Sequence, residues 1–217
     1  MSQIVASKLD NMPVPESHEV SISGGATFCF FKRVMDIVLS LIAFIVLLIP
    51  MVIIAVIIRL DTPGPVIFKQ ERLGLNRKPF VMYKFRSMYI NAEENGPQWA
   101  KKDDSRVTKV GRFLRNTRLD ELPQLWNIIR GEMSIVGPRP EREYFYGIFE
   151  ARIPYFGKRM LVKPGLTGWA QVNGGYELMP EQKIEYDLEY ICNRSLKIDI
   201  ICILKTFNLV FTKEGAR

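Results

Sequence analysis

Histidine is almost absent from this chain of 217 residues, since its one copy, His18, lies in a polar N-terminal stretch. A Ser-His-Asp triad, a Cys-His pair and a His-ligated zinc site are therefore excluded from the rest of the chain. Cysteine is scarce too, and Cys29, Cys192 and Cys202 form no CxxC motif and no even set. We expect a reduced, cytoplasmic domain whose chemistry relies on carboxylates, Lys, Arg, Tyr, Ser or Cys.

We expect the apolar run that follows residue 36 to be an anchor rather than a secretory signal, because the apolar core of a signal would begin nearer the N-terminus and end at a small-residue cleavage site. Residues 1–30 combine Pro, Ser and Gly with mixed charge and are expected to form a flexible tail. Residues 37–58 then contain no charged side chain. At ~1.5 Å per residue they reach about 33 Å as a straight helix, enough to cross a hydrocarbon core.

Pro50 interrupts this run, because proline lacks an amide proton and its ring clashes with the preceding helical turn. Lys32 and Arg33 precede the run and Arg59 follows it, so these long side chains can reach lipid headgroups. Asp36 lies one helical turn from Lys32 and can pair with it. A spanning helix would leave residues 1–31 outside, whereas a helix-break-helix would return to the same leaflet. The run alone is compatible with both.

The net charge of +7 resides entirely after residue 58, because residues 1–58 carry more acidic than basic side chains. A basic domain beside an apolar run suits an anionic bilayer surface and phosphorylated ligands. Nucleic acid is the other usual partner of such a charge, and the apolar run makes it the weaker interpretation.

The rest of the chain predicts one helix-rich α+β domain, residues 61–217. Residues 66–72 and 80–86 indicate two strands of a β-hairpin, and residues 91–105 a polar loop. Residues 106–118 place most of their basic side chains on one helical face. Residues 195–211 predict an amphipathic helix that lies on the membrane or on the core, because it is too short and too charged for a second span.

Asp120 and Glu121 are adjacent carboxylates at a predicted helix start, where Pro123 fits the first turn. Capping is the simpler role, since Asp120 is a good N-cap and Glu121 is favourable near the helix dipole. Arginines precede the pair, however, and a helix N-terminus beside them stabilises phosphate oxygens. A carboxylate at that place can bind Mg²⁺ or attack phosphorus.

Two further motifs surround possible ligand contacts. Pro138 and Pro140 hold Arg139 in a stiff loop after a short strand, and arginine offers a bidentate fork to phosphate. Residues 163–175 contain four glycines and Trp169, which can stack on a nucleobase, anchor at headgroups or simply pack beside a turn.

Together these motifs resemble the bacterial sugar transferase family, the monotopic polyprenyl-phosphate phosphoglycosyl transferases. The resemblance covers nearly all of residues 30–217, and it rests on several motifs in one order. The matching stretches are Phe31-Lys-Arg-Val-Met-Asp36, Phe68-Lys-Gln-Glu-Arg-Leu-Gly74, Tyr83-Lys-Phe-Arg-Ser-Met88, Leu119-Asp-Glu-Leu-Pro-Gln-Leu125, Val136-Gly-Pro-Arg-Pro140 and Pro164-Gly-Leu-Thr-Gly-Trp-Ala-Gln-Val172.

The resemblance implies a minimal catalytic form with a re-entrant membrane helix, residues 31–60, broken at Pro50. The family often has Ser before this proline and this chain has Ile49, which leaves the break angle open. The implied location is the cytoplasmic face of a bacterial inner membrane, with residues 1–31 on the same side. A homodimer is compatible with the sequence.

The implied activity transfers hexose-1-phosphate from a UDP-hexose to undecaprenyl phosphate and starts surface polysaccharide synthesis. Asp120 would attack the sugar-linked phosphorus, release UMP and form a sugar-phosphoryl-aspartate. Mg²⁺ near Asp120 would offset the diphosphate charge, with Glu121 as a second metal ligand or a base. The implied phosphate or substrate contacts are Arg139, Arg115, Lys84, Arg118 and Trp169.

Two other functions remain open at this point. A non-enzymatic membrane adaptor would gather partners on anionic lipid without a UDP-sugar. A sugar-only glycosyltransferase would release UDP and hold its metal with Asp103 and Asp104. Among sugars, Glu141 and Arg142 resemble glucose- or galactose-transferring members more than those that transfer N-acetylated sugars.

Overall fold

The computed structural model describes residues 20–94, 96, 98, 104–153, 155–174 and 178–212. Within these ranges the protein is helix-rich with two small sheets, so the expected α+β class is confirmed. The helices and strands in chain order are α2 (Ala26–Val46), α3 (Leu48–Asp61), β1 (Ile67–Leu73), β2 (Pro79–Phe85), α4 (Lys109–Asn116), α5 (Gln124–Arg130), β3 (Ser134–Val136), α6 (Glu143–Glu150), β4 (Gly165–Thr167), α7 (Trp169–Gly174), α8 (Pro180–Asn193) and α9 (Leu196–Thr212), with 3-10 turns η1 (Leu75–Arg77), η2 (Leu119–Glu121) and η3 (Phe156–Leu161).

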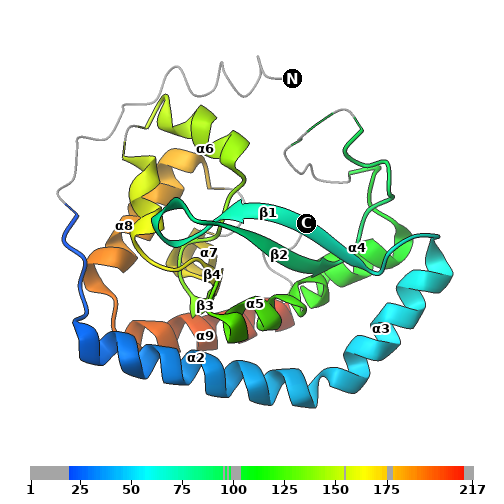
Figure 1. Ribbon diagram of the computed structural model, residues 1–217, viewed down its shortest axis with the longest axis horizontal. Helices are drawn as coiled ribbons and strands as arrows, with labels where there is room; N and C mark the ends of the chain where they lie inside the picture. The colour runs from blue at the N-terminus through cyan, green and yellow to red at the C-terminus, as the bar shows by residue number, and fades with distance from the viewer. Residues whose placement is uncertain are drawn as a thin grey trace.

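Helices α2 and α3 form a bent pair along one edge of the molecule (Figure 1), with an angle of 60° between them. Helix α2 ends at Val46. In an unbroken helix the Val46 carbonyl would accept from the amide of residue 50, but Pro50 has no amide proton. The break therefore lies at Leu47, and Pro50 sits in the first turn of α3 rather than at the break itself. Among the described helices, none can cross a membrane by itself on length and hydropathy, whereas this pair can when taken together.

Residues 20–25 and the first turn of α2 belong to the folded domain. Val20 packs against the largest core cluster, and the amide of Ser23 donates to the carbonyl of Ile191 over 3.1 Å. The carbonyl of Ser23 accepts from Arg194. The prediction of a flexible tail is thus wrong for residues 20–30, because α2 begins at Ala26. Residues 1–19 lie outside the described ranges.

Lys32 points from α2 into the domain rather than toward headgroups. Its ammonium donates to Asp199 Oδ2 of α9 over 2.6 Å and to the Val136 carbonyl of β3 over 3.0 Å. The Asp199 side chain is fully buried and also accepts from the Tyr190 hydroxyl over 2.7 Å. The predicted pair of Lys32 with Asp36 is wrong, because Asp199 is the partner at ion-pair distance.

Arg33 and Asp36 continue the same inward face of α2, since positions three or four apart share a side of a helix. Arg33 donates to two carbonyls in the last turn of α5, over 2.6 and 2.8 Å. Asp36 accepts from Ser134 Oγ over 3.1 Å and from the amide of Ile135 over 2.9 Å. The expected reach of Lys32 and Arg33 to headgroups is therefore wrong, because the domain satisfies both.

The predicted hairpin is confirmed to within one residue at each end. Strands β1 and β2 pair antiparallel from Ile67 opposite Phe85 to Leu73 opposite Pro79. Phe80 and Met82 of β2 pack on α5, whereas Phe85 packs with Ile58 of α3 and Leu114 of α4. The hairpin thus crosses above α5 in Figure 1 and contacts α3 and α4 at the far end of β2.

The short strand predicted before Gly137 is confirmed as β3, and it pairs in parallel with β4. We did not expect β4, because residues 163–175 indicated a shaped loop. The two backbones come very close: a Cβ added at Gly165 would lie 2.1 Å from the amide nitrogen of Gly137. This approach, which only glycine permits, fixes the start of the loop that carries Arg139.

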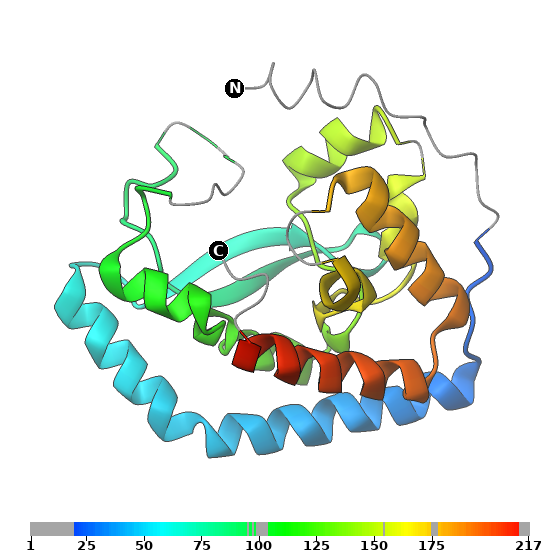
Figure 2. The same ribbon diagram turned by 180° about the vertical axis from the view of Figure 1, so that it is seen from behind.

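Helix α9 lies beside α2 in both views (Figures 1 and 2), as the contact between Lys32 and Asp199 requires. The apolar side chains of this predicted amphipathic helix have two different environments. Ile198 packs against the core, while Leu204 and Phe207 remain about 60% exposed (62% and 60%). One side of α9 is therefore buried and the other presents apolar side chains at the surface.

Candidate active site

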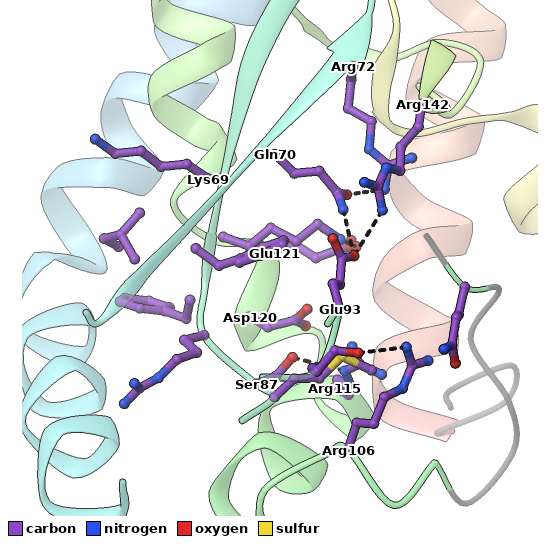
Figure 3. A pocket seen from close by; sticks show the side chains of 18 of the residues that line it. Lys69, Gln70, Arg72, Ser87, Glu93, Arg106, Arg115, Asp120, Glu121 and Arg142 are labelled. Carbon is purple, nitrogen blue, oxygen red and sulfur yellow. Dashed lines mark hydrogen bonds and ion pairs between the residues drawn. The ribbon is translucent and has the colours of Figure 1, made fainter. Parts of the chain in front are cut away.

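A cavity of about 790 Å³ opens between the hairpin, the segment after α4 and the loop after β3. It takes residues from elements far apart in sequence, and Figure 3 shows several of their side chains converging on it. All six charged residues that the sequence nominated for phosphate or catalysis line it: Lys84, Arg115, Arg118, Asp120, Glu121 and Arg139.

The chain reverses sharply before the carboxylate pair. Helix α4 is shorter than predicted, and Arg118 adopts a left-handed conformation at φ 57°. The 3-10 turn that follows leaves Asp120 and Glu121 at 7% and 6% exposure. The capping interpretation of Asp120 is wrong, because α5 begins later, with Pro123 at its N-cap and no side-chain cap bond.

Glu121 is held by two cations. Its Oε1 accepts from Lys84 Nζ over 3.0 Å and from the guanidinium of Arg139. Burial by itself would raise the pKa of Glu121, but Arg139 and Lys84 outweigh it and hold that pKa well below the usual range of glutamate. Glu121 is therefore ionised at any ordinary pH and is a poor base.

Asp120 has the opposite electrostatic environment. Burial raises its pKa to about 6, although Lys84 favours the charged form, and the neighbouring charge of Glu121 adds to the rise. Above that pH the cavity contains a poorly solvated carboxylate that faces several cations. Such a group is a good oxygen nucleophile and a good cation ligand.

Arg115 is oriented by its neighbour, because its Nε donates to Ser87 Oγ over 2.9 Å. Ser87 lies two residues after the end of β2, the strand that carries Lys84. Figure 3 shows Ser87 beside Arg115. The cations are thus attached to rigid elements rather than to free surface loops.

Trp169 does not line the cavity. It packs against the largest core cluster, and Lys205 Nζ lies 5.2 Å from the centre of its ring. The expected contact between Trp169 and substrate is therefore not found, and the packing alternative describes this residue.

Sequence reasoning missed a second group of lining residues, Gln70, Arg72, Glu93 and Lys183, and it named Arg142 only in connection with the transferred sugar. Gln70 and Arg72 carried a readable signal. They belong to the matching stretch that begins at Phe68, and residues two apart in a strand point to the same face, so these three side chains share one face of the hairpin. Glu93 and Lys183 carried no such signal, since only the tertiary fold brings their segments to the hairpin.

The donor set for a metal is small. Among the residues that the structure describes, no cluster of three or more His, Cys, Asp or Glu side chains is found. Asp104 is held by Arg106 through bonds of 2.8 and 2.5 Å, and Asp103 lies outside the described ranges. Asp120 with substrate phosphates fits Mg²⁺, which binds through one or two carboxylates plus phosphate oxygens and water.

A buried pair of carboxylates, surrounded by Lys and Arg in a cavity, is an arrangement suited to chemistry on phosphate groups. The chain belongs to the bacterial sugar transferase family, whose sequence profile matches residues 27–213. This agrees with the resemblance inferred from the motifs.

Curated relatives match over almost the whole chain. A UDP-N-acetylgalactosamine-undecaprenyl-phosphate N-acetylgalactosaminephosphotransferase of Aeromonas hydrophila is 42% identical over 97% of this chain and 50% of its own length. A UDP-glucose:undecaprenyl-phosphate glucose-1-phosphate transferase of Xanthomonas campestris pv. campestris is 41% identical over 97% of this chain and 45% of its own. The relative of the same name in Caulobacter vibrioides is 42% identical over 85% and 71%. The chain spans about half the length of the first two.

Proposed function

We propose that this protein is a phosphoglycosyl transferase that moves a hexose-1-phosphate unit from a UDP-sugar to undecaprenyl phosphate. The observation that carries the proposal is the division of the carboxylate pair: Glu121 is tied to two cations, and Asp120 is left facing the cavity. The names of the relatives support the donor and the acceptor. In this role the protein starts surface polysaccharide synthesis.

The reaction divides into two displacements at one phosphorus. An oxygen of Asp120 attacks the phosphorus that bears the sugar, the bond to the UMP oxygen breaks, and UMP leaves with the electron pair. An oxygen of the lipid phosphate then attacks the sugar-phosphoryl-aspartate and frees the Asp120 carboxylate. Two bulky substrates of different solubility can therefore use the same site in turn.

The basic side chains stabilise the charge that builds up during both steps. Arg139, Lys84 and Arg115 lie around the nucleophile, and each lowers the pKa of Asp120 through its charge. Glu121 is best described as a positioning residue, since it fixes Lys84 and Arg139 and its lowered pKa makes it a poor base. Mg²⁺, held by Asp120 and the diphosphate, would supply further charge neutralisation when bound.

We also propose that α2 and α3 dip into the cytoplasmic leaflet and return. Their outer surface is strongly apolar, with Leu60 81%, Ile49 73% and Val46 68% exposed. Leu204 and Phe207 of α9 extend this surface. Arg59 lies exposed at the end of α3, where it can reach headgroups. The bend is caused by Pro50, so Ile49 instead of Ser does not prevent it.

The re-entrant topology predicts that both ends of the chain stay on the cytoplasmic side. An N-terminal tag should resist labelling by a membrane-impermeant reagent added to intact cells and react after permeabilisation. A C-terminal tag is the matched control and should behave identically. Labelling of the N-terminal tag alone in intact cells would establish a spanning helix instead.

The identity of the leaving nucleotide tests the reaction class. Purified protein with undecaprenyl phosphate, Mg²⁺ and a panel of UDP-sugars should release UMP in amounts equal to the lipid-linked product. Release of UDP would support the sugar-only glycosyltransferase. No nucleotide release with any UDP-sugar would leave the membrane adaptor as the better explanation.

Our prediction for the transferred sugar remains glucose or galactose. The relatives act on N-acetylgalactosamine in one case and on glucose in another. Glu141, one of the two residues behind this prediction, is buried and held by Arg72 and Lys183, each over 3.3 Å. Both Glu141 and Arg142 line the cavity.

A further inference from the structure

The cavity has a second polar cluster outside the proposed reaction centre. Gln70 and Arg72 come from β1, Glu93 from the segment after β2, and Arg142 from the start of α6 (Figure 3). Glu93 Oε1 accepts from Arg142 over 2.9 Å and from Gln70 Nε2 over 3.3 Å. Arg72 donates to Gln70 Oε1 over 2.5 Å. Donors and acceptors therefore alternate along this wall of the cavity.

Glu93 differs from the other glutamates of the cavity wall. Glu121 and Glu141 are buried, and each is held by two cations. The side chain of Glu93 is 38% exposed, and both of its hydrogen bonds use Oε1. In the part of the chain that the structure describes, Glu93 therefore keeps an oxygen, Oε2, that can accept from a ligand.

The cluster suits hydroxyl groups rather than phosphate. A carboxylate repels phosphate but accepts hydrogen bonds from hydroxyls, and the neighbouring amide and guanidinium donate to hydroxyl oxygens. The phosphates already have Lys84, Arg115 and Arg139 elsewhere in the cavity. A UDP-sugar carries adjacent hydroxyls at two places, on the hexose and on the ribose.

We propose that Glu93, oriented by Gln70 and Arg142, binds a vicinal diol of the nucleotide-sugar donor and helps to determine donor specificity. This inference rests on the proposed function for the identity of the donor. The shared chemistry is a diol bound by a carboxylate, and the hexose and the ribose are its two sources. The acceptor lipid phosphate has no such diol, so its binding is independent of Glu93.

Glu93→Gln tests the subsite, because glutamine keeps the size of the side chain and loses its charge. We expect the KM for the UDP-sugar to rise about tenfold, as for loss of a hydrogen bond to a charged group. The KM for undecaprenyl phosphate and the melting temperature should not change. Glu94→Gln is the matched control, since Glu94 is exposed on the same segment and does not line the cavity.

Deoxy donors identify the source of the diol. The penalty of Glu93→Gln should shrink for the analogues that lack a hydroxyl of the bound diol, which lies either on the hexose or at the ribose 2′ and 3′ positions, and stay unchanged for the others. An equal penalty for every analogue, or an equal effect of Glu94→Gln, overturns the proposal. If the wild-type protein releases no UMP, the proposed function fails by itself. Calorimetric titration with the UDP-sugar then tests the subsite, and equal affinities of wild type and Glu93→Gln overturn it.

Discussion

Replacement of Asp120 by Asn should reduce the release of UMP from a UDP-sugar by at least about a thousandfold, the scale of loss for a covalent nucleophile. The amide has nearly the same shape but cannot form the acyl phosphate. Wild-type protein incubated with a donor labelled in the sugar phosphate should retain label after denaturation, and the variant should retain none. Turnover near the wild-type rate, or label retained by the variant, would contradict the covalent mechanism.

The fold should survive this change. Burial raises the pKa of Asp120 to about 6, so its pKa in the folded state exceeds its pKa in the unfolded state. At a pH between these two pKa values the folded state binds more protons than the unfolded state. Ionisation of Asp120 therefore costs stability as the pH rises through that interval, and Asn removes this cost. The melting temperature of Asp120→Asn should not fall at neutral pH. In the wild type, UMP release should decline as the pH is lowered through about 6, because the nucleophile takes up a proton.

Glu121→Gln provides the comparison within the pair. It leaves the nucleophile in place but removes the anion that positions Lys84 and Arg139. We expect slower UMP release together with retained label, because the covalent step is still available. The two variants thus separate a residue that bonds to phosphorus from one that orients its neighbours.

Replacement of Lys32 by Met should destabilise the protein by roughly 3–5 kcal/mol, because it leaves the buried Asp199 carboxylate without its cation. For a chain of this size the melting temperature in detergent should fall by roughly 10 °C. Lys197→Met is the matched control, since Lys197 is exposed on α9, and should have little effect.

The pH and a second substitution test the cause of this loss. Burial raises the pKa of Asp199, against the opposing charge of Lys32. Without that cation the folded-state pKa rises further above the unfolded value, so the stability of Lys32→Met should recover as the pH falls. The double variant Lys32→Met, Asp199→Asn should regain most of the lost melting temperature. Equal loss in single and double variants would show that the ion pair is not responsible.

Local patterns predicted the elements that depend on neighbouring residues. Two strand-like segments joined by a short loop located the hairpin to within one residue. The apolar run with Pro50 located the helical region but left a spanning helix and a broken one open, and the bend was implied by the family resemblance. The β3–β4 pair escaped prediction because it depends on Gly137 and Gly165 touching across the fold. Trp169 was assigned to substrate for the same reason: a tryptophan in a glycine-rich stretch has no local feature that separates packing from stacking.

By itself the sequence excluded histidine-based chemistry outside residues 1–19 and placed Asp120 beside Glu121 among arginines. Tertiary structure decided the surroundings of the two carboxylates, since Lys84 and Arg139 both reach Glu121 and leave Asp120 toward the cavity. It also turned Lys32 from headgroups to Asp199, 167 positions away. Periodicity describes which residues share a face, but only packing determines what that face meets.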